Sequence, residues 1–93
     1  MELGKRLFSL RKERGITLKD ATKRCGCSYQ NLQKIEKGII TSPKLDLLYK
    51  IAAFYQFPSD ILIIEARKIP QDVYYRIIDN PQLLQIIRNF EAQ

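Results

Sequence analysis

One short segment of this sequence gathers side chains that can form hydrogen bonds with the edges of nucleic-acid bases. Their spacing places them on one side of a helix, and they are Tyr29, Gln30, Gln33 and Lys34. Glutamine can pair with adenine through two hydrogen bonds, lysine can reach the O6/N7 edge of guanine, and a tyrosine ring can pack on a thymine methyl group. The segment is therefore a candidate for contacting the major groove of duplex DNA.

The positive charge of the chain is concentrated in the half that holds this segment. The net charge is +6 over 93 residues. Residues 1–50 hold twelve Lys and Arg against five Asp and Glu, a net charge of +7, whereas residues 51–93 hold four against five, a net charge of −1. A basic half suits a polyanionic partner, although an ordinary solvated basic surface would give the same count.

Other chemistries find little support in the sequence. There is no histidine, and two cysteines cannot supply the four ligands of a structural zinc site. No nucleophile stands beside a base, and no glycine-rich loop could cradle a phosphate. No apolar run approaches the ~20 residues of a membrane span, and the N-terminus lacks a signal-peptide core. We expect a cytoplasmic, nucleoid-associated protein that is not an enzyme and needs no metal or other cofactor.

The two thiols lie two residues apart, at Cys25 and Cys27. A disulfide over this distance would be strained, so we expect both thiols to be reduced, as in a cytosol. A redox sensor is an alternative, because the neighbouring Lys23 and Arg24 would lower a thiol pKa. The simpler interpretation is that Cys27 fills an apolar position next to the turn glycine.

The elements that must position the candidate segment are short helices. A leucine stripe at i, i+4 and i+7 predicts a first helix that Gly15 ends: Leu3, Leu7 and Leu10. Thr17, with Asp20 three residues later, is a variant of the capping box that opens a second helix over residues 18–24. Ser28 caps a third helix over residues 29–37, which Gly38 ends.

The rest of the chain also predicts helices. Pro43 suits the first turn of a fourth helix, whose apolar side is Leu45, Leu48, Ile51 and Ala52. Further helical patterns cover residues 61–65, 71–78 and 81–92, and in the last of these Asn80 is a candidate cap and Pro81 a candidate first helical residue. No segment alternates with period two over the length of a strand. The predicted class is all-α.

The second and third helices form a helix-turn-helix pattern. Gly26 allows a sharp turn where a Cβ atom would clash. Three apolar side chains can wedge the third helix against the core: Cys27, Leu32 and Ile35. The opposite side of that helix is then free to enter a major groove about 12 Å wide.

The stretch LGKRLFSLRKERGITLKDATKRCGCSYQNLQKIEKG, followed by SPKLDLLYKIAAFYQFPSDIL, resembles the Cro/C1-type helix-turn-helix of phage repressors and bacterial XRE-family regulators. The resemblance covers residues 3–65. It implies a five-helix phage-repressor-like DNA-binding domain over residues 1–66, with a C-terminal helical extension over residues 67–93. It also implies a sequence-specific regulator, most often a repressor, that acts on a palindromic duplex operator as a dimer.

The resemblance also assigns roles by position. The base-contacting residues would be Tyr29, Gln30, Gln33 and Lys34. The phosphate-contacting residues would be Ser28, Lys37, Thr41, Lys44 and Lys19. Arg11 would pair with Glu36 as a structural salt bridge.

The sequence departs from the family pattern at three places. Thr22 stands where a small alanine is usual, and Leu18 replaces a bracing glutamine. The loop after Gly38 reads Ile39-Ile40-Thr41 in place of basic or polar residues. Phosphate contacts from this loop are therefore in doubt, and an apolar contact is suggested instead.

The extension is the expected dimerisation element. Leu83, Ile87 and Phe90 form one apolar line, and Leu84 and Ile86 lie off it. We expect one line to pack back on the domain and the other to meet a second copy. The alternatives are a helix that merely completes the monomer core, and a dimer interface at Ile39 and Ile40.

A different function on the same fold is the main competing hypothesis, namely an RNA-binding or protein-interaction adaptor. Five tyrosines and four phenylalanines could stack on bases. Several stand at helical spacing and are better interpreted as core, including Phe54, Phe57 and Phe90. The tail IPQDV…NPQLL…IR resembles small XRE regulators, some encoded beside metallopeptidases that cleave them, so a regulatory protein partner is left open.

Overall fold

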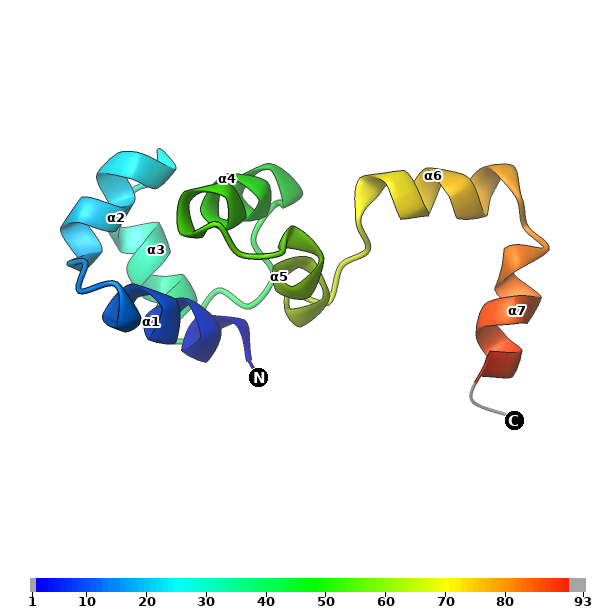
Figure 1. Cartoon of the computed structure of the whole chain (residues 1–93), viewed down its shortest axis with the longest axis horizontal. Coiled ribbons are helices and arrows are strands. Elements are labelled where there is room, and N and C mark those ends of the chain that lie inside the picture. The colour runs from blue at the N-terminus through cyan, green and yellow to red at the C-terminus, as the bar shows by residue number, and fades with distance from the viewer. Residues whose placement is uncertain (1, 91–93) are drawn as a thin grey trace.

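The computed structural model describes residues 2–90, and these form helices and loops without a strand. The helices are α1 (Leu3–Glu13), α2 (Leu18–Cys25), α3 (Tyr29–Glu36), α4 (Leu45–Tyr55), α5 (Ser59–Glu65), α6 (Gln71–Asp79) and α7 (Leu83–Phe90). Figure 1 shows α1–α5 gathered in one body, from which α6 and α7 lead away. The predicted all-α class is confirmed.

The hydrophobic core lies among α1–α5. The leucine stripe of α1 is buried as its spacing predicted, and each such side chain contributes roughly 1.5–3 kcal/mol of transfer free energy. Gly4 lets α1 approach α3 closely, because a Cβ atom there would lie 2.6 Å from the Ile35 carbonyl oxygen. The buried apolar residues are Leu3, Leu7, Leu10, Ala21, Cys25, Leu32, Ile35, Leu48, Ile51, Ala52, Tyr55, Leu62, Ile63 and Ala66.

Local hydrogen bonds define the helix-turn-helix. The Thr17 hydroxyl oxygen accepts from the Asp20 backbone N–H at 3.1 Å and opens α2. The Ser28 hydroxyl oxygen accepts from the Asn31 N–H at 3.1 Å and opens α3. Gly26 between them has φ 70°, the left-handed region that favours glycine. Both predicted caps and the predicted turn are confirmed.

Two helix starts differ from the sequence prediction. Lys44 is the N-cap of α4, so Pro43 lies before the helix and not in its first turn. The α5 helix begins at Ser59, two residues earlier than expected, because Pro58 serves as its N-cap. The sequence pattern placed the start of α5 at its first apolar residue, Ile61. In the structure the fixed φ of Pro58 lets the helical conformation begin at the next residue.

The start of α7 was also predicted wrongly. Pro81 lies in a turn before the helix, which begins at Leu83. Asn80 does not cap α7: its side-chain Nδ2 donates to the Arg76 carbonyl oxygen at 3.1 Å, at the end of α6. The same carbonyl oxygen also accepts from the Asn80 backbone N–H at 3.0 Å, so Asn80 closes the end of α6 through both its backbone and its side chain.

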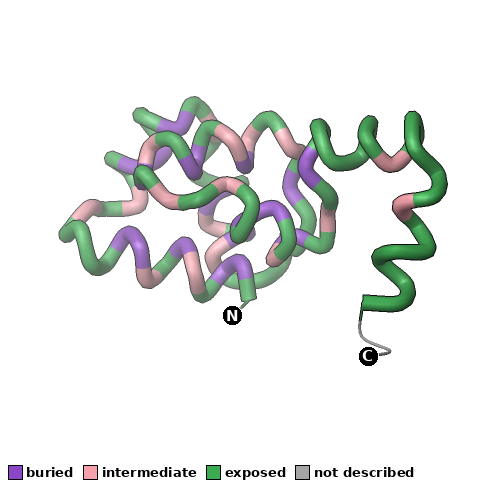
Figure 2. Tube along the Cα trace, turned by 45° about the vertical axis from the view of Figure 1, so that its right-hand side comes forward, coloured by how far each residue is buried: buried purple, intermediate pink, exposed green. Residues whose placement is uncertain are grey.

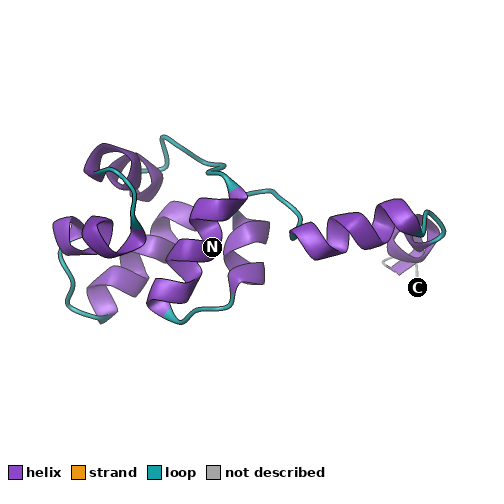
Figure 3. Cartoon of the chain, turned by 90° about the horizontal axis from the view of Figure 1, so that it is seen from above, coloured by secondary structure: helices purple, strands orange, loops and turns teal. Residues whose placement is uncertain are grey.

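The extension buries none of its helical residues. Every residue of α6 and α7 is exposed except Ile77 and Leu83, which are half-buried. In Figure 2 the buried colour stops where α6 begins, and Figure 3 shows α6 leading away from the other helices. Within one chain, therefore, α7 neither packs back on the domain nor completes its core, and both of those expectations are wrong.

The apolar residues of α7 form one stripe and not two lines. At about 100° per residue, the five apolar side chains fall within an arc of roughly 160°. Those residues are Leu83, Leu84, Ile86, Ile87 and Phe90. Phe90 is 75% exposed, so its interpretation as core is wrong, whereas Phe54 and Phe57 pack against the core as expected.

Candidate nucleic-acid interface

The third helix is held by one side and leaves the other side free. Leu32 and Ile35 are each 1% exposed and anchor α3 in the core. Cys27 is only half-buried, and Cys25 at the end of α2 lies deeper, at 2% exposure. Cys27 packs against the core as the sequence predicted, and the deeper burial of Cys25 is an additional contact that the sequence reasoning did not identify.

The polar side of α3 carries the predicted base-contacting residues. Tyr29, Gln30 and Lys34 are exposed, and Gln33 is half-buried between them and the core side. Asn31 is exposed as well, at the N-terminal turn of the helix. Sequence reasoning did not select Asn31, although its place three residues after the cap at Ser28 was the available signal.

An ion pair joins the C-terminal turn of α3 to α1. Arg11 Nε lies 2.9 Å from Glu36 Oε2, and Arg11 Nη2 donates to Glu36 Oε1 at 3.0 Å. A third donor, Arg11 Nη1, reaches the Ile16 carbonyl oxygen at 3.1 Å. The hydrogen bond to Glu36 raises the pKa of Arg11. The carboxylate beside the polar face is thus neutralised internally.

Two further arginines, Arg6 in α1 and Arg14 at its C-cap, stabilise the fold in ways that local sequence patterns do not predict. Arg6 pairs with Glu65 of α5, with 3.0 Å between Arg6 Nη2 and Glu65 Oε2. Arg14 Nη2 donates to the Tyr55 carbonyl oxygen at 2.7 Å, at the end of α4. These contacts join residues 59 and 41 positions apart, respectively, beyond the reach of any local spacing rule.

The predicted phosphate-contacting residues lie in α2, at the N-cap of α3 and between α3 and α4, and all are exposed: Lys19, Ser28, Lys37, Thr41 and Lys44. The Ser28 hydroxyl accepts the capping bond and keeps its own proton to donate. In the loop after α3, Ile39 is 67% exposed while Ile40 packs against the core. Both of their backbone N–H groups donate to the Lys34 carbonyl oxygen, at 2.8 and 3.1 Å, so this loop is tied to the end of α3.

The raised pKa values of the two thiols do not favour a redox sensor. Both cysteines are free, and burial raises the pKa of Cys25 to about 11 and also raises the pKa of Cys27. The expected lowering of the thiol pKa by Lys23 and Arg24 is wrong, because both cations are exposed and desolvation of the thiolate is the largest effect. Among residues 2–90 no three potential ligands gather as a metal site, and no helix is long and apolar enough to cross a membrane.

A buried anchor, a free polar face and a neutralised carboxylate are the features of a DNA-binding helix-turn-helix. The family model described as Helix-turn-helix matches residues 7–62, more than half of the chain. The chain therefore belongs to this family, the Cro/C1-type or XRE helix-turn-helix family, and is a DNA-binding transcriptional regulator. No curated protein matches it.

A solved structure shares the fold beyond the family domain. The chain is similar to one in the SinR protein/SinI protein complex, with a TM-score of 0.63 and 20% sequence identity. The likeness covers 97% of this chain and 95% of that chain, so it takes in the helical extension as well. At this identity it describes the fold alone.

Proposed function

We propose that this regulator is a sequence-specific repressor that binds a palindromic duplex operator as a dimer. The observation that carries the proposal is the division of α3 into a buried side and a free polar side. Leu32 and Ile35 hold the helix, while the opposite side offers donors and acceptors and no unpaired carboxylate. A helix exposed in this way can lie in a major groove with its polar side against base edges.

Base contacts would determine sequence specificity, and phosphate contacts would position the protein on the duplex. Tyr29, Gln30, Gln33 and Lys34 contact base edges, and their proximity along α3 limits each half-site to a few base pairs. Lys19, Ser28, Lys37, Thr41 and Lys44 contact the phosphates and fix the register of the helix. The basic N-terminal half, with its net charge of +7 from twelve Lys and Arg against five Asp and Glu, supports this assignment.

Dimerisation is assigned to the extension, residues 67–93. An exposed apolar stripe on α7 is costly in water, and a second copy would remove it from solvent. A two-fold pair would set two recognition helices about one turn of DNA apart, roughly 34 Å. Repression follows from such a dimer when the operator overlaps a promoter, and a protein that acts there works in the cytoplasm at the nucleoid.

The decisive experiment is selection of bound sequences from a pool of random duplex DNA. The expected result is two inverted half-sites with centres one helical turn apart. Affinity for the selected site should fall about 10³–10⁵-fold between 50 and 200 mM salt if six to ten phosphates are contacted. Recovery of no consensus, or stronger binding to single-stranded RNA than to duplex, would exclude the proposal.

A truncation tests the dimer. A chain ending at Arg67 retains all of α1–α5 and should fold, but light scattering should give the mass of a monomer. Operator affinity should drop because each half-site is then bound alone. A folded truncated chain that stays dimeric would contradict the role of the extension.

A protein partner is a further element of the proposal. The similar structure is a complex of two proteins, SinR and SinI. An exposed apolar extension is a surface through which a regulatory protein could act on this chain, by competing with a second copy for α7.

A further inference from the structure

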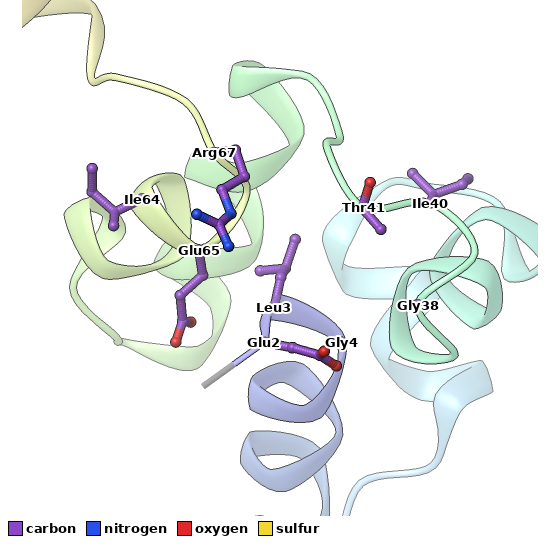
Figure 4. Close-up of a pocket in the computed structure, with 9 residues that line it drawn as sticks. All are labelled: Glu2, Leu3, Gly4, Gly38, Ile40, Thr41, Ile64, Glu65 and Arg67. Atoms are coloured by element: carbon purple, nitrogen blue, oxygen red, sulfur yellow. The ribbon is translucent and has the colours of Figure 1, made fainter.

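One exposed apolar side chain stands in the loop directly after α3. Ile39 is 67% exposed, whereas the next residue, Ile40, packs against the core. Figure 4 shows this loop leaving α3 at Gly38 and passing through Ile40 and Thr41, all three of which line a hollow of about 680 Å³ beside α1 and α5. Ile39 does not line that hollow. Within residues 2–90, therefore, most of this side chain is left uncovered.

Two backbone hydrogen bonds fix where Ile39 lies relative to α3. The Gly38 N–H donates to the Ile35 carbonyl oxygen at 3.1 Å, and the Ile39 N–H donates to the Lys34 carbonyl oxygen at 2.8 Å. Gly38 has φ 80°, in the left-handed region. These bonds and the left-handed glycine make a Schellman motif, which folds the residue after the glycine back against the last turn of the helix. Ile39 is thus held at the turn that carries Lys34, one of the predicted base-contacting residues.

The charge around Ile39 indicates what covers it. Lys34 in α3 and Lys37 at its C-cap form no ion pair with the described residues. The carboxylate between them in sequence, Glu36, is already paired with Arg11. A two-fold contact through Ile39 would therefore set the lysines of two copies against each other. A polyanion that also presents an apolar group fits this surface better, and duplex DNA does so through its thymine methyl groups.

We propose that Ile39 packs on a thymine methyl group and is a specificity-determining residue in addition to the polar side of α3. The inference rests on the proposed docking of α3 in the major groove and extends the half-site that it reads. The Ile39 side chain has no donor or acceptor, so it cannot bind a phosphate or the polar edge of a base. The apolar group that base edges present in the major groove is the thymine C5 methyl. In the loop considered above as a dimer interface, Ile40 then belongs to the core and Ile39 to the DNA contact.

Deoxyuridine tests the contact, because it lacks the methyl group of thymine and keeps its hydrogen-bonding edge. Each thymine of the selected half-site is replaced in turn, in both half-sites together, and affinity is measured by fluorescence anisotropy. At one position the affinity should fall about fifteenfold, since each buried methyl group contributes about fourfold and the dimer buries two. Ile39→Ala should lose a similar factor on the thymine operator and little more on the deoxyuridine operator. Ile64→Ala, at an exposed position of α5, is the matched control and should lose affinity for neither.

A second variant adds a readout besides affinity at one salt concentration. Ile39→Lys places a cation beside the duplex, so it should bind the two operators alike and steepen the slope of log affinity against log salt. A selected site in which no thymine couples to Ile39 overturns the contact and leaves the proposed function intact. The same holds if Ile39→Ala weakens the DNA-free dimer in sedimentation equilibrium, which would make Ile39 a contact between copies. Recovery of no duplex consensus overturns both proposals.

Discussion

Arg11 of α1 donates two hydrogen bonds, of 2.9 and 3.0 Å, to the carboxylate of Glu36 in α3. The two side chains of this ion pair are only 11% and 6% exposed. The pair lies at the last turn of the recognition helix, so it fixes the direction in which that helix projects. Charges removed from water to this extent are stable only together, because each one alone would lack a counter-ion.

We therefore expect either single substitution to lower the free energy of unfolding more than the double substitution does. Arg11→Met or Glu36→Gln alone should lower the free energy of unfolding by about 3–5 kcal/mol, and the double variant by less than the sum. Urea denaturation of the four proteins measures the coupling. The Arg6–Glu65 pair is the matched control, and because Arg6 is 27% exposed its coupling should be smaller. A coupling near zero for Arg11 and Glu36 would show that the pair is not a unit.

Specific and non-specific DNA contacts should separate by substitution. Gln30→Ala should cost about 1–3 kcal/mol of binding free energy on the selected operator and little on random duplex, because it removes a base contact. Lys44→Ala should weaken binding to both duplexes alike and reduce the slope of log affinity against log salt by about one. Fluorescence anisotropy on the two duplexes gives all of these values. Equal losses on both duplexes for Gln30→Ala would show that α3 is misassigned.

Alkaline pH should destabilise the domain through two buried groups. Burial raises the pKa of Cys25 to about 11 and that of Tyr55 to about 12, from ordinary values of 9.0 and 10.0. A raised folded-state pKa means that the folded protein holds its proton more tightly. The resulting stability is complete below the ordinary pKa and is lost as pH rises toward the folded pKa. The thermal midpoint should therefore fall between about pH 9 and pH 12.

Tyr55→Phe isolates one of these groups. The Tyr55 hydroxyl is buried and makes no hydrogen bond with the described residues, so its removal breaks none of those contacts. At pH 7 the thermal midpoint should stay the same or rise, and above pH 10 the variant should lose less stability than the parent. Tyr74→Phe, at an exposed position, should change neither property. A fall in the midpoint of Tyr55→Phe at pH 7 would mean that the hydroxyl has a stabilising partner.

The end of α4 offers a stabilising substitution. Gln56 adopts φ 51°, the left-handed region that disfavours residues with a Cβ atom. Gln56→Gly should raise the free energy of unfolding by about 0.5–1 kcal/mol, since relief of this strain exceeds the added chain entropy. Ala53→Gly, three residues earlier inside the same helix, should lower it by about 1 kcal/mol. Urea titrations in which both glycines act in the same direction would contradict this account.

Features that depend on a few neighbouring residues could be predicted from the sequence alone. The caps at Thr17 and Ser28 and the turn at Gly26 are of this kind, because each bond or dihedral lies within four consecutive residues. The same holds for the two sides of α3, since helix geometry places Leu32 and Ile35 together and away from Gln30. The helix-turn-helix and its polar face can therefore be predicted from the local spacing of residue types.

Periodicity identifies an apolar face but does not say what covers it. This is why the stripe of α7 was predicted correctly as apolar and wrongly as packed on its own domain. The depth of Cys25 relative to Cys27 likewise depends on how α2 meets α4, and the pKa shifts of both thiols follow from that depth. The pairing of Arg6 with Glu65 required two distant helices to meet. Such contacts are decided only when the whole chain has folded, because their free energy depends on the water that the other helices exclude.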